Sequence, residues 1–353
     1  MRFTINFKLR LIGWIKRKFF QTIRFQPYRW TSIRREERAE ASRIEIGTTF
    51  SSALPITILD PRSKIIRNFF YNERKFFNIE QAIIEPFQGL IWTATKRAEL
   101  LKESTRWHPY VLQTSFPVKP FRTKIKKINE GVILTSTPYW HWLIEDLPLT
   151  IGILQKELKN LPIIVSTSRP KYVDDFIALT NNPYIETSGF TNVSKLHTAD
   201  KGDNSGWPHP NDIKILKNYE PFAKYINSNS DRKIYISRKY SKRSPRNEQE
   251  VENTFLEFGF EVHYFEKLNL LEQISLSSTA KIIAGIHGAG LSNMIWMSEG
   301  GKIIDIYNEN YWTESFHRSA HICKLDYIHF GYPGATKNDV NILELKKFLI
   351  TIY

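Results

Sequence analysis

The sequence predicts an α/β protein with two domains, and three observations support this. The chain has 353 residues, which is more than one typical domain contains. Hydrophobic residues make up 41% of it and aromatic residues 14%, which is enough for packed cores and excludes a largely disordered chain. From residue 232 onward, strand and helix patterns alternate four times with short connections, which is typical of a doubly wound parallel sheet.

The C-terminal half can be divided into elements directly. Runs of β-branched and aromatic residues predict strands at 233–237, 261–265, 281–286 and 302–307. Asn247 is expected to cap a helix with Glu250 in the capping-box position, and Gly259 to end that helix. Further helices are expected at 270–276 and 291–297, and an amphipathic C-terminal helix at 338–350.

The N-terminal half has a weaker pattern. Strands are expected at 131–134 and 161–165, a helix at 171–179 and a loop at 198–212, where turn-forming residues are dense. Residues 49–134 are otherwise mixed and give no defined order of elements. The organisation that the sequence predicts is an arm at 1–48, a first domain at 49–220 and a second domain at 221–353.

The basic charge is concentrated in the arm. The net charge is +14, and the first 35 residues hold ten Lys or Arg with no acidic residue. The rest of the chain is only mildly basic, so a broad nucleic-acid surface is not indicated. Read as a helix, residues 2–26 carry apolar side chains on one face, namely Leu11, Trp14, Ile15, Phe19 and Ile23. Such a segment can lie on an anionic membrane surface or pack on the protein itself, and nucleic-acid binding is a less favoured third interpretation. Charges interrupt it too often for it to span a bilayer, and it lacks the apolar core of a signal peptide.

A glycine-rich turn is the sharpest motif. The apolar strand that ends at Ile286 is followed by His287-Gly288-Ala289-Gly290 and then by a predicted helix. Ligands of open α/β sheets bind outside the carboxyl ends of the strands, and the N–H groups that begin a helix attract phosphate. The glycines would let the main chain approach a phosphate and His287 would donate to it. The alternative is a tight turn that needs glycine for its conformation alone.

Two further clusters carry charge. Five cations follow the strand at 233–237, and at the same sheet edge they could hold a pyrophosphate or form a solvated face: Arg238, Lys239, Lys242, Arg243 and Arg246. Within Tyr139–Pro148, His141 and Glu145 share a face if the segment is helical. A carboxylate beside a His suits a general base, although both groups could instead be structural. The chain has no Asp-x-Asp pair, so no metal site is expected.

These motifs together resemble the glycosyltransferase 61 family, which includes bacterial capsule and lipopolysaccharide enzymes and eukaryotic xylosyl- and N-acetylglucosaminyltransferases. The resemblance covers about residues 130–350. It rests on four segments in the family's order, namely His141 to Pro148, Tyr235 to Arg238 with Arg243 and Asn247-Glu248, Glu272 to Ile274, and His287 to Asn293.

The resemblance implies a GT-B fold, in which two Rossmann-like domains face a cleft, and sugar transfer with inversion, usually without metal. In the second domain it implies donor binding by Arg238, Arg243, His287, Gly288, Ala289, Gly290 and Asn293, with a ribose contact from Asp305. In the first domain Glu145 holds the family's acidic position, accompanied by His141. Asp146 is an additional acid at this point of the sequence.

The sequence-based expectation is therefore an inverting, metal-independent glycosyltransferase without a cofactor. It would use a UDP-linked donor and a surface-polysaccharide or glycolipid acceptor, and it would not bind nucleic acid. The alternative is an inactive membrane-associated scaffold for polysaccharide assembly. The single cysteine, Cys323, excludes an internal disulfide and favours a cytoplasmic location, with residues 2–26 as a contact to the inner face of the plasma membrane.

Overall fold

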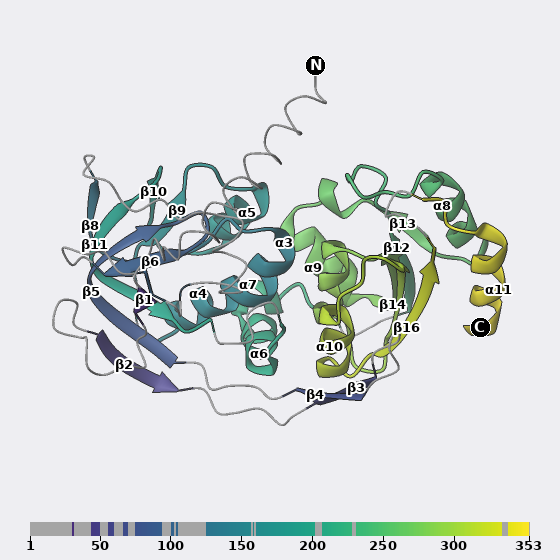
Figure 1. The fold of residues 1–353 in the computed structure, drawn as a ribbon, viewed down its shortest axis with the longest axis horizontal. Helices are drawn as coiled ribbons and strands as arrows, with labels where there is room; N and C mark the ends of the chain where they lie inside the picture. Colours follow the sequence, from purple (N-terminus) through teal and green to yellow (C-terminus); the bar gives the residue numbers. More distant parts are fainter. Residues whose placement is uncertain are drawn as a thin grey trace, which may run out of the picture.

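The computed structural model describes residues 30–31, 44–49, 56–59, 66–69, 75–93, 100–101, 104, 125–156, 158, 160–201, 207–227, 231–333 and 338–352. The basic segment predicted at 2–26 lies outside these residues. Two sheets stand apart with helices between them, and further helices cover the outer face of the second sheet (Figure 1). No helix of the described residues is long and apolar enough to cross a membrane.

The first sheet is mixed. Its described strands run in the order β1-β7-β6-β5-β11-β8-β9-β10, and β2 pairs with β5. The strands are β1 (Trp30–Thr31), β2 (Ile44–Thr49), β5 (Lys75–Glu85), β6 (Leu90–Thr93), β7 (Leu100–Leu101), β8 (Lys126–Ile133), β9 (Ile163–Ser166), β10 (Tyr184–Thr187) and β11 (Thr191–Ala199). Strand β11 is parallel to β8 but antiparallel to β5, so only the end β11-β8-β9-β10 has the parallel order of a Rossmann-like domain. Strands β3 (Ile56–Leu59) and β4 (Ile66–Phe69) form a separate antiparallel pair.

The second sheet is fully parallel, as the sequence predicts. Its order is β13-β12-β14-β15-β16. The strands are β12 (Arg232–Ile236), β13 (Glu261–His263), β14 (Ala280–Ile286), β15 (Lys302–Asn308) and β16 (Asp326–Tyr332). Strand β16 and the helix before it, α10 (Ser315–Ile322), are absent from the sequence-based prediction. The strand order reverses between β12 and β14, and ligands of such sheets bind at that reversal.

The helices that the sequence predicts are present with three differences in detail, and further helices form that it does not predict. Besides α10, the described helices are α3 (Tyr139–His141), η3 (Trp142–Asp146), α4 (Leu147–Leu154), α5 (Lys171–Leu179), α6 (Pro210–Asn218), α7 (Glu220–Ala223), α8 (Glu248–Glu257), η4 (Phe265–Lys267), α9 (Leu270–Ser278), η5 (Ala289–Trp296) and α11 (Ile342–Ile352). The loop predicted at 198–212 is wrong at both ends, because β11 continues to Ala199 and α6 begins at Pro210. The helix expected at 291–297 is a 3₁₀ helix, η5.

The third difference concerns the predicted capping box. Asn247 precedes α8, but its side chain does not cap that helix. It accepts the N–H of Val340 and donates to the Val340 carbonyl, both at 2.9 Å, and so ties α8 to the segment before α11. A capping box does form at α9, between Asn269 and Glu272. The tertiary contact to Val340 therefore replaces the local bond that the spacing predicts.

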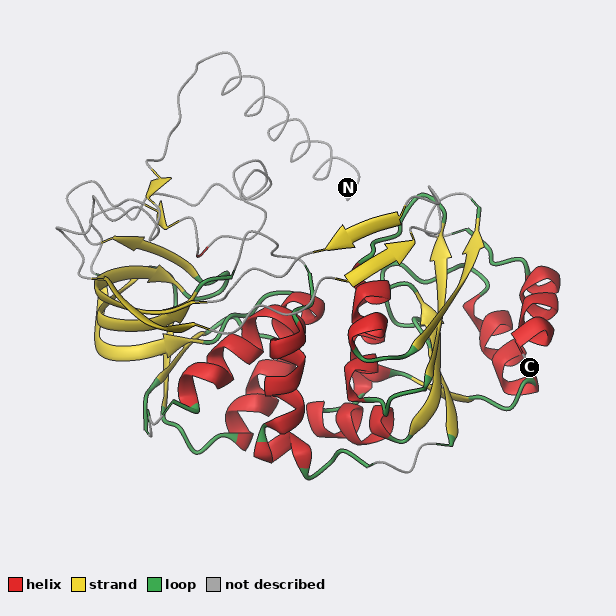
Figure 2. Ribbon diagram, turned by 90° about the horizontal axis from the view of Figure 1, so that it is seen from below, coloured by secondary structure: helices red, strands yellow, loops and turns green. Residues whose placement is uncertain are grey.

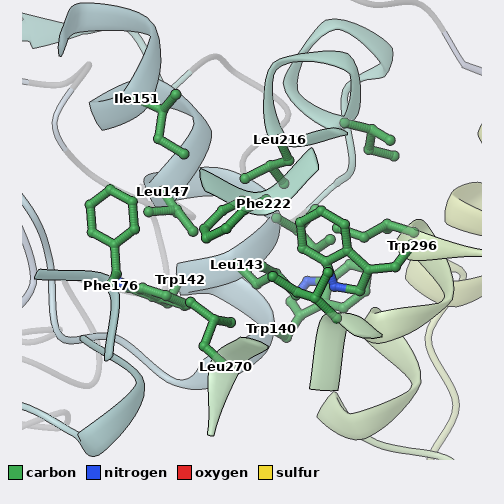
Figure 3. Close-up of a cluster of buried hydrophobic side chains, with 14 of the residues drawn as sticks. Trp140, Trp142, Leu143, Leu147, Ile151, Phe176, Leu216, Phe222, Leu270 and Trp296 are labelled. Atoms are coloured by element: carbon green, nitrogen blue, oxygen red, sulfur yellow. The ribbon is translucent and has the colours of Figure 1, made fainter. Parts of the chain in front are cut away.

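One apolar layer joins the two sheets. Helices fill the space between them (Figure 2), and a single core cluster includes Trp142 and Phe176 from the first half together with Leu270 and Trp296 from the second (Figure 3). Trp296 meets the ring of Phe222 edge-on, with ring centroids 5.6 Å apart. The domain boundary expected after residue 220 and the open cleft of a GT-B fold stay predictions.

We expect Trp296→Ala to lower the free energy of unfolding by about 3–5 kcal/mol, because it leaves a cavity in the shared core. Since both sheets pack on this layer, circular dichroism during urea unfolding should record one transition at a lower midpoint. Leu256→Ala is the matched control, since Leu256 is 53% exposed on α8 and should change stability by less than about 0.5 kcal/mol. Two separate unfolding transitions, only one of which shifts to a lower urea concentration in Trp296→Ala, would contradict a shared core.

Candidate active site

A cavity of about 370 Å³ opens at the reversal of the second sheet. One wall comes from the carboxyl ends of β12 and β14 and from η5, through Ile236 to Arg238, Ile286 and Ala289 to Leu291. The opposite wall comes from the first half, through Tyr139 on α3 and Tyr172 on α5. The position agrees with the rule that parallel sheets bind ligands outside their carboxyl ends.

The glycine turn forms the floor of this cavity. The Leu291 N–H donates to the Gly288 carbonyl at 2.9 Å, whereas the N–H groups of Ala289 and Gly290 meet no acceptor among the described residues. Both residues line the cavity. Unpaired N–H groups at the start of a helical segment are suited to bind an anion.

Gly288 is required for space. Its φ of 168° is extended backbone that any residue adopts. A Cβ there would lie 1.8 Å from Nη1 of Arg238. The guanidinium therefore lies directly on the turn, in the place that a side chain at 288 would occupy.

Arg238 is fixed by three hydrogen bonds. Its main-chain N–H donates to Glu248 Oε1 at 2.8 Å, its Nε to Ser241 Oγ at 3.0 Å, and its Nη1 to the His287 carbonyl at 2.5 Å. Burial, followed by the charge of Arg243, lowers the pKa of Arg238. Neither arginine has a carboxylate within ion-pair distance in the part of the chain that the structure describes.

The other cations of this loop face elsewhere. Arg246 pairs with Asp339 at 3.2 Å and its side chain is 71% exposed. Lys239 Nζ donates to Gln249 at 2.6 Å. The guanidinium of Arg243 instead lies over the ring of Tyr311, 4.6 Å from its centroid. The predicted cluster thus separates into two arginines near the glycine turn and cations on the surface.

Of the predicted donor-binding residues, Arg238, Ala289 and Gly290 line the cavity. Five others do not line its described walls, namely Arg243, His287, Gly288, Asn293 and Asp305. Asn293 is fully buried and donates to Gln273 Oε1 and to the Gly290 carbonyl, each at 3.1 Å, while Tyr139 donates to its Oδ1 at 3.2 Å. His287 Nδ1 lies 2.7 Å from Oδ2 of Asp305, which is fully buried. Their predicted contacts with a donor remain predictions.

His141 and Glu145 come together as the sequence predicts for a helix. The His141 Nδ1 lies 3.1 Å from Glu145 Oε2, and the carboxylate is buried while the imidazole is partly exposed. Glu145 belongs to η3, a π-helical turn in which Leu147 N–H bonds to the Trp142 carbonyl. Such wide turns occur often at functional sites.

Asp146 has a different environment. Its Oδ2 accepts from Thr137 at 2.8 Å and also from Thr135, and Lys201 Nζ lies 3.4 Å from Oδ1. Thr135 and Thr137 follow β8 and Lys201 follows β11, so Asp146 faces the first sheet. The two neighbouring carboxylates are thereby separated into one beside a histidine and one within a structural network.

The sequence-based site lacks several cavity residues. Tyr240, Phe265 and Leu268 line the cavity beside Arg238, and Lys171 and Asp175 line it from α5. Tyr240 follows β12 and Phe265 follows β13, so the same carboxyl-end rule would have identified them. Lys171 and Asp175 carry no such pattern, because they approach from the other half of the chain.

Residues 139–304 match the family model of glycosyltransferase 61. This segment, which is a little under half of the chain, is similar to the glycosyltransferase 61 family. The matched segment begins at Tyr139 on the cavity wall and ends within β15, so it includes His141, Glu145 and the glycine turn. No curated protein matches the chain.

The match confirms the family that the sequence motifs indicate, and it supports transferase activity. Within the matched segment lie both walls of the cavity, Arg238 and Arg243, and the pair formed by His141 and Glu145. Among the described residues, no group of three or more His, Cys, Asp or Glu is arranged to hold a metal.

We expect Gly288→Ala to leave the fold intact and to weaken binding of uridine diphosphate by roughly 1.5–3 kcal/mol, because the new Cβ displaces the guanidinium that would bind the anion. Isothermal titration measures this. In an Arg238→Ala background, Gly288→Ala should cause almost no further loss of binding free energy, because the two changes act on one contact. Additive losses would mean that Gly288 acts independently of Arg238.

Proposed function

We propose that this protein is an inverting glycosyltransferase that moves a sugar from a nucleotide-sugar donor to a polysaccharide or glycolipid acceptor. The observation that carries the proposal is Arg238, which lines the cavity with Ala289 and Gly290 at the reversal of a parallel sheet, and whose pKa is lowered by the charge of Arg243. Among the described residues, neither arginine has a carboxylate within ion-pair distance, and the N–H groups of Ala289 and Gly290 meet no acceptor. Two like charges close together in a partly buried place favour the binding of an anion, and a diphosphate is such an anion.

The cavity suits the remainder of a nucleotide donor. With its diphosphate against Arg238 and the N–H groups of Ala289 and Gly290, the base would extend toward Tyr240, Phe265 and Leu268. Ligand sites commonly combine such apolar walls with a few polar groups that fix orientation. A UDP-linked sugar is the donor that we propose, because the family resemblance favours it.

Transfer requires a base on the acceptor side. Glu145 is our candidate, since it is a buried carboxylate in contact with His141, on the same short helical segment that brings Tyr139 to the cavity. It would take the proton of an acceptor hydroxyl, whose oxygen attacks the anomeric carbon opposite the departing diphosphate.

The leaving group needs positive charge. Arg238, Arg243 and the N–H groups of the glycine turn would stabilise the diphosphate as it departs, which is the role that a metal ion has in other transferases. We therefore propose a metal-independent reaction. From the family resemblance we further propose a bacterial surface polysaccharide or glycolipid as the acceptor and action in the cytoplasm, at the membrane surface.

We expect Arg238→Ala and Arg243→Ala each to weaken binding of uridine diphosphate by roughly 1.5–3 kcal/mol, the scale of a hydrogen bond to a charged group. Isothermal titration provides the measurement. Arg246→Ala is the matched control, because Arg246 belongs to the same loop but is exposed and paired with Asp339. Equal affinity in all four proteins would remove the phosphate assignment.

We expect Glu145→Gln to reduce donor turnover by roughly 10²- to 10⁴-fold in excess EDTA, because the amide keeps the shape but takes no proton. Affinity for the nucleotide should change little. Asp146→Asn should instead lower the melting temperature, since it removes the charge partner of Lys201, and leave the rate of the folded enzyme within about tenfold. A wild-type rate for Glu145→Gln, or loss of wild-type turnover in EDTA, would contradict the mechanism.

A further inference from the structure

Both ring nitrogens of His287 have protein partners. The main-chain N–H of Thr313 donates to Nε2 at 3.2 Å, and Nδ1 lies 2.7 Å from Asp305 Oδ2. Because a main-chain N–H is only a donor, Nε2 must be the acceptor and the ring proton must be on Nδ1. His287 is therefore held as the neutral Nδ1–H tautomer.

Asp305 determines this tautomer. Its Oδ2 accepts from Tyr327 Oη at 2.5 Å as well as from His287. Trp312 Nε1 donates to Tyr327 Oη at 3.2 Å, which leaves the phenol proton for Asp305. A carboxylate that receives two donors on one oxygen is an acceptor for His287, and it holds the ring proton at Nδ1.

The Thr313 bond holds the segment between β15 and α10. Within this segment Tyr311 meets the His287 ring edge-on, with ring centroids 5.7 Å apart. The guanidinium of Arg243 lies on the same tyrosine. A continuous series of contacts thus runs from Asp305 through His287 and the 309–314 segment to Arg243.

We propose that His287 is a positioning residue, which as a neutral acceptor holds the 309–314 segment and thereby orients Arg243, and that it does not bind the diphosphate itself. The part of this inference that concerns the diphosphate rests on the proposed function. The part that concerns the histidine and Thr313 does not depend on it. Arg238 is oriented by the same residue through the His287 carbonyl.

The inference fixes the sign of a pH effect. A proton on Nε2 would face the Thr313 N–H, so acid should release the segment and weaken nucleotide binding. A histidine that bound phosphate as a cation would behave oppositely and lose affinity as the pH rises. Among the described residues, the titratable groups in contact with the ring are Asp305 and Tyr311. Tyr327 bonds to Asp305, and His317 and His329 lie against Tyr327. Arg238 donates to the His287 carbonyl, and Arg243 lies on Tyr311.

Three substitutions separate the two roles. His287→Gln can present an oxygen near the place of Nε2, whereas His287→Asn reaches only to Nδ1 and His287→Ala reaches neither. Hydrogen exchange at the Thr313 amide should be slow in wild type and in the Gln variant, and fast in the other two. Long-range ¹H–¹⁵N spectra of wild type, with the His287 signal assigned from its loss in the variants, should show an Nδ1–H tautomer at neutral pH.

Binding of uridine diphosphate provides the functional readout. We expect about a tenfold loss of affinity in His287→Ala, the scale of one lost hydrogen bond to a charged group, and a smaller loss in His287→Gln. Adding Arg243→Ala to His287→Ala should cost less than it does in wild type, because that arginine is already displaced. Lowering the pH should weaken uridine diphosphate binding more in wild type than in His287→Gln, because the variant has no ring nitrogen to protonate.

Several outcomes would overturn the proposal. The first is a Thr313 amide that exchanges equally fast in wild type and in His287→Ala. The second is a His287 ring that carries its proton on Nε2, or on both nitrogens, at neutral pH. The third is a His287→Gln variant that binds uridine diphosphate as weakly as His287→Ala, together with a wild-type affinity that falls as the pH rises. Wild type that binds no uridine diphosphate would count against the proposed donor. In that case the exchange and tautomer measurements still decide the role of His287.

Discussion

Trp296 packs against Phe222 in the middle of an apolar layer that belongs to both sheets. Aromatic side chains of this size bury roughly 150–250 Å² each, which is on the order of 4–6 kcal/mol at about 25 cal/mol per Å². Everything at the cavity depends on this layer, because one wall comes from each half of the chain. The bond from Tyr139 to Asn293, and from there to Gln273, crosses the same junction next to the cavity.

The electrostatics of the cavity follow from how Arg238 is held. Arg238 is anchored through its main chain by Glu248, a buried carboxylate whose Oε1 also accepts from Tyr235 and Ser237. Burial raises the pKa of Glu248 and lowers that of Arg238, so both groups are held against the preference of their charges for water. Among the described residues, no carboxylate lies within ion-pair distance of the Arg238 guanidinium, and an anionic ligand would offset the cost of its burial.

Two adjacent acids illustrate how helix geometry assigns different roles. Neighbouring residues of a helix point about 100° apart, so Glu145 meets His141 one turn earlier while Asp146 meets Thr137 and Lys201. Of these two carboxylates, Glu145 therefore lies beside a partly exposed imidazole and Asp146 lies within a buried hydrogen-bond network. This difference in partners is the physical basis for choosing Glu145 as the base.

The local sequence pattern was sufficient to predict much of this structure. The parallel strands of the second sheet, α5, the helical contact of His141 with Glu145 and the family itself follow from the order of residues, because periodicity and motif spacing are properties of neighbours in the chain. Long-range contacts decided the remainder. Asn247 binds Val340 instead of capping its helix, Gly288 makes room for Arg238, and Asp305 and Thr313 occupy both nitrogens of His287. Each of these depends on a partner distant in sequence, and only the packing of the folded chain brings that partner within hydrogen-bonding or van der Waals distance.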